Sequence, residues 1–78
     1  MQHTSLVSDT LISMGYDETT HTLELTFKRD GSVYQYANVP ADVAAGLQAA
    51  ADDDSASAGI YFHAHIRAVY PARRVMKR

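Results

Sequence analysis

The chain of 78 residues contains no cysteine, which excludes disulfides and thiolate-bound zinc as sources of stability. It also has no apolar run near the roughly 20 residues that cross a bilayer. Residues 1–5 lack the basic and apolar regions of a signal peptide. A chain this short lies near the lower limit for a single apolar core. We therefore expect one domain over residues 1–78, cytoplasmic and without membrane contact.

Acidic residues are absent from the last third of the chain. The formal net charge is −2, and all nine acidic residues lie between Asp9 and Asp54. The basic residues after Asp54 are Arg67, Arg73, Arg74, Lys77 and Arg78. A basic segment of this kind attracts phosphate or an acidic protein surface. The alternative is a solvated C-terminus that complements the end of a helix.

Motifs that carry enzyme chemistry are absent as well. The sequence has no glycine-rich phosphate loop and no nucleophile elbow around a serine. His63 and His65 stand two residues apart, about 200° around a helix, so they do not readily chelate one ion. The acidic run at 52–54 lacks the glycine and the distal glutamate of a calcium loop. We expect no enzymatic activity, no cofactor and no metal site.

Three segments alternate apolar and polar residues, which is the pattern of strands with one wet face: 10–16, 23–28 and 33–36. Asp30-Gly31 between the last two is a strong hairpin signal. Loops of even length pair Tyr16 with Leu23, Met14 with Leu25, Phe27 with Tyr34, and Leu25 with Tyr36. The predicted core face contains Ile12, Met14, Tyr16, Leu23, Leu25, Phe27, Tyr34 and Tyr36. We interpret Tyr34 and Tyr36 as core rings with hydrogen-bonded hydroxyls, rather than as exposed recognition side chains.

A helix is expected over residues 40–51, because a sheet with one apolar face needs a cover. Pro40 suits the first turn of a helix. Val43, Leu47 and Ala50 recur at helical spacing and predict an amphipathic face. Gly46 should weaken this helix by about 1 kcal/mol relative to alanine.

A second helix is expected over residues 58–69, with Ser55 or Ser57 as its N-cap. Its core stripe would contain Phe62, Ile66 and Val69. The predicted fold is therefore α+β, a three-stranded antiparallel meander followed by two short helices packed on one face. Residues 1–9 would form a loose arm and residues 72–78 a basic tail.

A series of short motifs runs through nearly the whole chain. They are Val7-Ser8, Gly15-Tyr16-Asp17, Leu23-x-Leu25-x-Phe27, Gly31-x-Val33-Tyr34-x-Tyr36, Val39-Pro40, Ser57-x-Gly59, Phe62, Ile66-Arg67 and Tyr70. In order and spacing, the chain resembles the KTSC domain, a small bacterial and phage module also found at the C-terminus of some lysyl-tRNA synthetases. It departs from that family in a longer passage over 52–56, and in His63, where asparagine is common.

The resemblance implies a non-enzymatic binding module, with RNA as the candidate ligand because of the synthetase context. The candidate binding residues are Arg67, Arg73, Arg74, Lys77 and Arg78 for phosphate, with Tyr61 for base stacking and His63 beside them. The residues expected to be structural are Tyr34, Tyr36, Pro40 and Gly59. The alternative hypothesis is a protein-interaction module that docks on a host protein or self-associates as a homo-oligomer.

Overall fold

The computed structural model describes residues 3–6, 10–52 and 57–77. They form an α+β fold with one antiparallel sheet and two helices, the second of which continues into a π-helical turn. The elements are β1 (His3–Ser5), β2 (Leu11–Asp17), β3 (Thr22–Phe27), β4 (Ser32–Tyr36), α1 (Ala41–Asp52), α2 (Ala58–Phe62), η1 (His63–Arg67) and β5 (Ala72–Lys77). Among these residues, no helix has the length and apolar character to span a membrane.

The sheet has five strands in chain order, β1-β2-β3-β4-β5, so the prediction of three strands was wrong. The additional strands lie in the segments interpreted as an arm and a tail. Both are edge strands, and polar or charged edge strands carry little of the apolar alternation that marks a half-buried strand. The basic C-terminal segment is therefore ordered as β5 against β4.

The predicted register of the first hairpin, between β2 and β3, is confirmed. The pairs are Met14 with Leu25 and Tyr16 with Leu23. The register shifts between Leu11 and Ser13, where a β-bulge interrupts the ladder. The bulge turns Leu11 into the core, fully buried, and leaves Ile12 45% exposed. The prediction that Ile12 faces the core was therefore wrong.

The second hairpin has the predicted face but not the predicted pairs. Tyr34 lies opposite Leu25 and Tyr36 opposite Leu23, a shift of two residues from the expected register. The shift arises because the loop covers residues 28–31 and is closed by the Gly31 amide, which donates to the Phe27 carbonyl at 3.0 Å. Because side chains alternate with a period of two, both tyrosines stay on the core side of the sheet.

The start of α2 follows the sequence prediction. The Ser57 hydroxyl accepts a hydrogen bond from the Ile60 amide at 3.2 Å, which confirms Ser57 as the N-cap. The other candidate cap, Ser55, lies outside the described residues. Gly59 is buried against Thr10, and a Cβ at this position would lie 2.6 Å from the Thr10 hydroxyl oxygen. Glycine therefore lets α2 approach the start of β2 closely.

The end of the second helix differs from the prediction. Phe62 and Ile66 are buried as expected, but Val69 is 60% exposed. The π-helical turn η1 holds more residues per turn than an α-helix, so the apolar stripe no longer reaches Val69. Tyr70 packs against the core after the helix instead.

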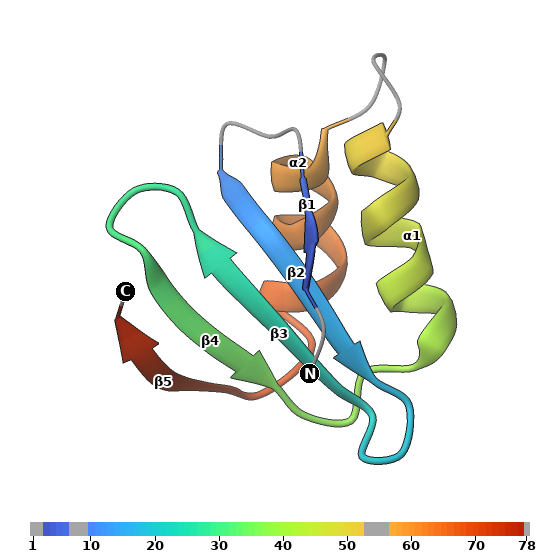
Figure 1. The fold of residues 1–78 in the computed structure, drawn as a ribbon. Coiled ribbons are helices and arrows are strands. Elements are labelled where there is room, and N and C mark those ends of the chain that lie inside the picture. Colours follow the sequence, from blue (N-terminus) through green and yellow to red (C-terminus); the bar gives the residue numbers. More distant parts are fainter. Residues whose placement is uncertain (1–2, 7–9, 53–56, 78) are drawn as a thin grey trace.

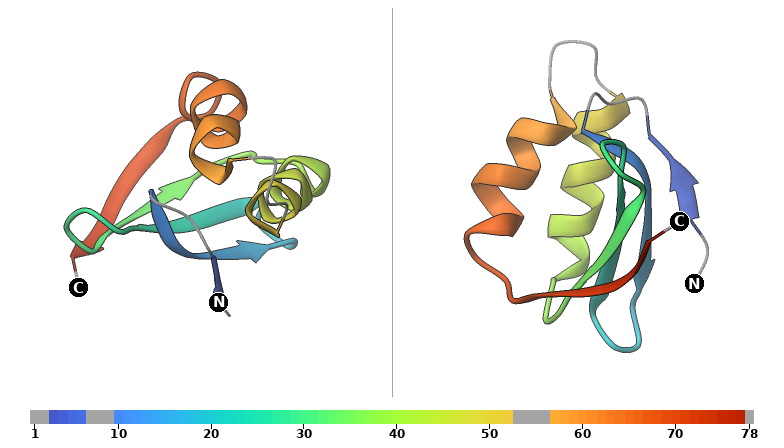
Figure 2. Two further views of the ribbon diagram at one scale, coloured as in Figure 1. Left: turned by 90° about the horizontal axis from the view of Figure 1, so that it is seen from above. Right: turned by 90° about the vertical axis from the view of Figure 1, so that its left-hand side faces the viewer.

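Both helices lie on one side of the sheet, and β5 forms the sheet edge beside β4 (Figure 1, Figure 2). Helix and strand side chains share one buried cluster, which includes Leu23, Leu25, Tyr36, Leu47, Phe62 and Ile66. The Phe62 ring makes edge contacts with Phe27 and Tyr36, at centroid distances of 5.3 and 5.6 Å. These contacts hold α2 against the β3–β4 hairpin.

Candidate functional site

A groove of about 840 Å³ opens between the β3–β4 hairpin and the α2–η1 helix. We call it the hairpin–helix groove. Its aromatic lining consists of Phe27, Tyr34, Tyr36, Phe62 and Tyr70. Its charged and titratable lining consists of Lys28, Arg29, Asp30, His63 and Arg67, and Thr10, Ser32 and Ala72 complete it. The volume falls in the range of about 300–1,000 Å³ that is typical of small-ligand sites.

Tyr36 lines this groove from β4, which pairs with β3 on one side and β5 on the other. The residue is only 4% exposed, yet its hydroxyl makes no hydrogen bond with any residue that the structure describes. The expectation of a hydrogen-bonded hydroxyl therefore stays a prediction for this residue. Burial, together with the neighbouring Tyr34, raises the pKa of Tyr36 to about 12, against a smaller opposing effect of Arg67. The phenol is thus neutral at physiological pH and remains a hydrogen-bond donor.

Tyr34 stands next to Tyr36 on the same face, where it is partly buried. Its ring meets Phe27 edge to face, at a centroid distance of 5.5 Å and an angle of 81°. This arrangement forms a rigid aromatic wall along the hairpin side of the groove. Flat ring surfaces of this kind bind other flat groups, such as nucleic-acid bases.

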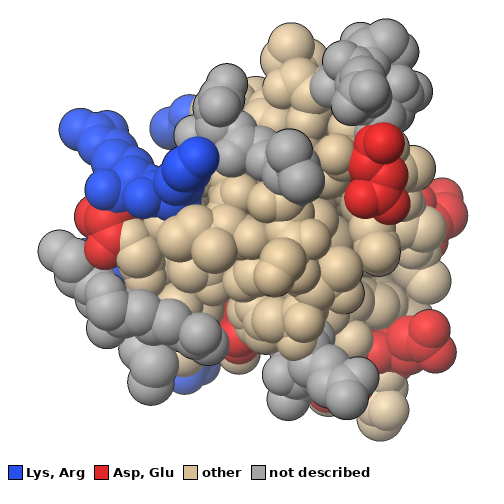
Figure 3. Space-filling model, turned by 45° about the horizontal axis from the view of Figure 1, so that its top comes forward, with Lys and Arg blue, Asp and Glu red and all other residues tan. Residues whose placement is uncertain are grey.

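Among the residues that the structure describes, three permanent cations line the groove, and they come from two different segments. Lys28 and Arg29 lie in the exposed β3–β4 loop, and Arg67 lies at the end of η1. Figure 3 shows lysine and arginine side chains gathered at one side of the molecule, with acidic side chains mainly on the opposite side. Among the described residues of the lining, the carboxylate is that of Asp30, whose Oδ1 accepts a hydrogen bond from the Ser32 amide at 3.0 Å. The lining therefore carries more positive than negative charge.

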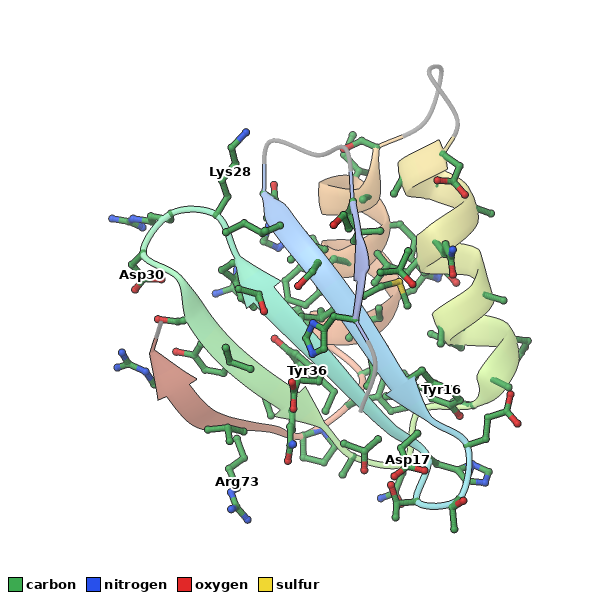
Figure 4. All side chains as sticks on the ribbon, in the orientation of Figure 1. Tyr16, Asp17, Lys28, Asp30, Tyr36 and Arg73 are labelled. Atoms are coloured by element: carbon green, nitrogen blue, oxygen red, sulfur yellow. The ribbon has the colours of Figure 1, made fainter. Side chains whose placement is uncertain are left out.

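Arg73 and Arg74 of the C-terminal segment are not part of the described groove lining. The register places Arg73 opposite Gln35 and Arg74 opposite Tyr34, so that they project from opposite faces of β5. Figure 4 shows Arg73 far from Lys28, at the other end of the sheet edge. Lys77 pairs with Ser32 along the backbone, and Arg78 lies outside the described residues. Of the five predicted phosphate contacts, the groove lining includes Arg67.

Tyr61, the predicted stacking residue, lies between the two helices rather than in the groove. Its hydroxyl donates to the Val43 carbonyl of α1 at 3.1 Å. Its ring lies 4.5 Å from the His65 ring, measured between centroids. Burial raises the pKa of Tyr61, with smaller contributions from Asp42 and Tyr70. The structure thus gives Tyr61 a packing contact that already occupies its hydroxyl.

The two helical histidines are separated as the sequence predicted. His63 lines the groove, and its Nδ1 lies 3.4 Å from Nη1 of Arg67. His65 contacts Tyr61 and is absent from the groove lining. Within the described residues, no three His, Asp or Glu side chains come together to hold a metal ion.

Pro40 holds the first turn of α1, where its carbonyl accepts hydrogen bonds from the amides of Val43 and Ala44 at 3.1 and 3.2 Å. The preceding residue, Val39, is fully buried, and its carbonyl accepts the Tyr16 hydroxyl at 2.5 Å. Pro40 therefore lies at the junction that joins the sheet to α1.

The sequence interpretation missed several groove residues, chiefly Lys28, Arg29, Ser32 and Tyr70. Lys28 and Arg29 precede the Asp30-Gly31 turn, so a hairpin loop carrying two adjacent cations was visible in the sequence. Their proximity to Arg67 was not visible, because it depends on how α2 packs over the hairpin. Long-range packing, rather than any local motif, assembles this site.

The outer face of the sheet holds a separate polar cluster. His3 lies 2.8 Å from the Ser13 hydroxyl through Nδ1, and 2.5 Å from Glu24 through Nε2. Gln35 donates to the other oxygen of Glu24 at 2.9 Å. These bonds tie β1, β2, β3 and β4 together on the face away from the helices, so the cluster is a cross-strand brace.

Comparison with known proteins assigns the chain to a family. The model of the KTSC domain matches residues 7–70. The crystal structure of the KTSC domain protein YPO2434 from Yersinia pestis superimposes with a TM-score of 0.84 at 28% identity, covering 96% of this chain and 97% of that one. A comparison with curated proteins found no match. The family match spans most of the chain, and the similar structure has the same fold, so the chain belongs to the KTSC domain family.

Proposed function

We propose that this KTSC domain is a non-enzymatic module that binds single-stranded RNA in the hairpin–helix groove. The observation that carries the proposal is the convergence of Lys28, Arg29 and Arg67 on a groove with an aromatic wall. Single-stranded nucleic acids are bound by this combination, in which cations follow the backbone and rings stack on bases. We expect such a module to act in the cytoplasm, where RNA is available.

The exposed cations are suited to the electrostatic part of binding. Lys28 and Arg29 are exposed and form no ion pair with another described residue. They can therefore contact phosphate without first breaking a salt bridge, and such contacts release counterions from the nucleic acid. The overall charge of −2 is compatible with this, because the acidic side chains lie mainly on the other side of the molecule (Figure 3).

A titration with a single-stranded RNA at low and moderate salt tests the proposal. We expect binding to weaken as salt rises, and Lys28→Gln and Arg67→Gln each to lower the salt slope by about 1, the loss of one phosphate contact. Arg73→Gln makes the same charge change outside the groove and serves as the matched control. Absence of binding at low salt, or equal effects of Arg67→Gln and Arg73→Gln, would contradict the proposal.

A second candidate function is protein interaction, favoured by exposed apolar side chains on the second helix and after it. Ile60 is 72% exposed and Val69 is 60% exposed. Isolated apolar residues are common on surfaces, whereas a contiguous patch marks a docking site. Light scattering at several concentrations, with Ile60→Ser and Val69→Ser for comparison, tests whether these side chains pair two copies. A host protein would be identified by capture with the native domain that fails with the double variant.

A further inference from the structure

We infer that the hairpin–helix groove contains a specific position for a phosphate monoester, formed by the Tyr36 hydroxyl and the Arg67 guanidinium. The groove would thus hold one nucleotide with a terminal phosphate, rather than only a stretch of phosphodiester backbone. This inference rests on the proposed function, because it names the ligand group recognised in the same groove.

The floor of the groove presents a donor that the protein leaves unpaired. Tyr36 is 4% exposed, its ring is fixed edge-on against Phe62, and its hydroxyl has no hydrogen-bond partner among the described residues. Among the described residues, Thr26 Oγ1 is the buried side-chain oxygen without a partner, so the Tyr36 hydroxyl is not sealed off from solvent. Because Tyr36 lines the groove, a ligand that enters it can accept a hydrogen bond from this hydroxyl. Two partly buried tyrosines differ in this respect, since the Tyr16 hydroxyl donates to the Val39 carbonyl and the Tyr61 hydroxyl to the Val43 carbonyl.

The surroundings of this hydroxyl select an anion. Tyr36 and Arg67 both line the groove. Burial and Tyr34 raise the pKa of Tyr36 and keep the phenol protonated, against a smaller opposing effect of Arg67. The ligand therefore meets a neutral O–H donor beside a guanidinium that stays charged at all accessible pH values. A phosphate oxygen accepts from both groups, and charge-assisted bonds of this kind are about twice as strong as neutral ones.

The depth of the donor favours a monoester over a diester. The Tyr36 residue is only 4% exposed and lines the groove, so a ligand reaches its hydroxyl from within the groove. A phosphate monoester has three free oxygens and one ester link, whereas an internal diester carries chain on both sides. The wall formed by Tyr34 and Phe27 then offers a ring surface for the attached base.

Charges at the rim support the same ligand. Lys28 and Arg29 of the β3–β4 loop line the groove, and His63 lies beside Arg67. Asp30 is the carboxylate of the lining, and it is engaged with the Ser32 amide that begins β4. A monoester carries up to two negative charges, which matches the three permanent cations and one acid among the described residues of the lining.

The test compares adenosine 5′-monophosphate, adenosine and inorganic phosphate as ligands of the full chain, by calorimetry or NMR titration. We expect the monophosphate to bind at least about 10-fold more tightly than adenosine, since a hydrogen bond to a charged group contributes about 10- to 100-fold in affinity. Tyr36→Phe, which removes one oxygen and keeps the ring, should remove most of this preference. Tyr61→Phe removes a tyrosine hydroxyl outside the groove and should not. Arg67→Gln and Arg73→Gln form a second matched pair.

A free mononucleotide and the phosphorylated end of an RNA share this chemistry. Short single-stranded RNAs with a 5′-phosphate or a 5′-hydroxyl separate the two, because only an end-binding site gains affinity from both the phosphate and the following nucleotides. Equal binding of adenosine and its monophosphate, or equal effects of Tyr36→Phe and Tyr61→Phe, would overturn the inference. RNA binding that ignores the terminal phosphate would overturn it and leave the proposed function standing. Binding of the monophosphate without binding of RNA would overturn the proposed function and leave the phosphate position in the groove standing.

Discussion

Tyr61 of α2 lies directly over Gly46 of α1. Its hydroxyl donates to the Val43 carbonyl at 3.1 Å, and a Cβ added to Gly46 would lie 2.7 Å from Cζ of the Tyr61 ring. The glycine thus gives the space in which the two helices approach each other. Helix propensity alone makes Gly46 a destabilising residue, whereas this contact makes it a residue that the packing of the two helices requires.

Gly46→Ala is expected to destabilise the domain by about 1–3 kcal/mol, because the new methyl group displaces the Tyr61 ring. Propensity alone predicts the opposite, a gain of about 1 kcal/mol. Urea unfolding of the variant measures the sign of the change in the free energy of unfolding. In a Tyr61→Ala background the clash disappears, and the same substitution should become neutral or stabilising. A gain in the native background would show that the ring does not pack on this glycine.

The stability of the domain should fall at alkaline pH through Tyr36. The folded pKa, about 12, is above the unfolded value of 10.0, so the contribution is fully present below pH 10 and is lost as pH rises toward 12. We expect a loss on the order of 1–2 kcal/mol across this window. Burial also raises the pKa values of Tyr16 and Tyr61, so these groups add to the slope. Tyr36→Phe should therefore flatten the dependence in part, measured by urea unfolding at successive pH values. A slope unchanged by Tyr36→Phe would contradict the assignment.

Ser57→Ala should cost about 1 kcal/mol, since it removes the side chain that accepts the Ile60 amide at the start of α2. Thermal unfolding followed by circular dichroism measures the loss. Ser57→Asp keeps an acceptor at the N-cap and should retain stability close to that of the native chain. Equal losses in both variants would indicate that the serine acts through something other than the cap.

Removal of residues 72–78 distinguishes an ordered strand from a solvated tail. β5 pairs with β4 along its length, and Ala72 pairs with Tyr36, so its removal uncovers the strand that carries Tyr34 and Tyr36. A domain of this size has a stability of only about 5 kcal/mol, so we expect loss of cooperative unfolding. Arg73→Gln keeps the strand and should unfold as the native chain does. A truncated chain with native stability would show that β5 contributes nothing.

Much of the fold was predictable from local patterns. Alternation located β2, β3 and β4, and the spacing of Val43 and Leu47 located α1. The preference of serine for the N-cap position predicted the start of α2 at Ser57. These signals depend on residues close together in sequence, where side-chain periodicity reports directly on which face is buried.

The remaining features depend on tertiary context. β5 carries Arg73 and Arg74 and has no clear apolar face, so only pairing with β4 reveals it as a strand. The bulge at Ile12 and the π turn at His63–Arg67 each insert one residue into a regular pattern, which moved Ile12 and Val69 to the surface. No composition rule marks such insertions.

The candidate site was predictable only in part. Arg67 and His63 were among the expected binding residues and do line the groove. Lys28 and Arg29 were not expected there, and the β3–β4 hairpin places them in the lining. Tyr36 was expected to be structural, and its ring is part of the core. Its unpaired hydroxyl could not be predicted, because it depends on which carbonyls lie within reach in three dimensions.

The most direct test of the account is an NMR titration of the isotopically labelled domain with a single-stranded RNA carrying a 5′-phosphate. The account predicts that signals of groove residues shift, with the largest changes at Tyr36, Arg67 and the 28–32 loop. Signals of α1, Ala41–Asp52, should stay in place. Shifts confined to Arg73 and its neighbours on β5, or no shifts at all, would contradict it.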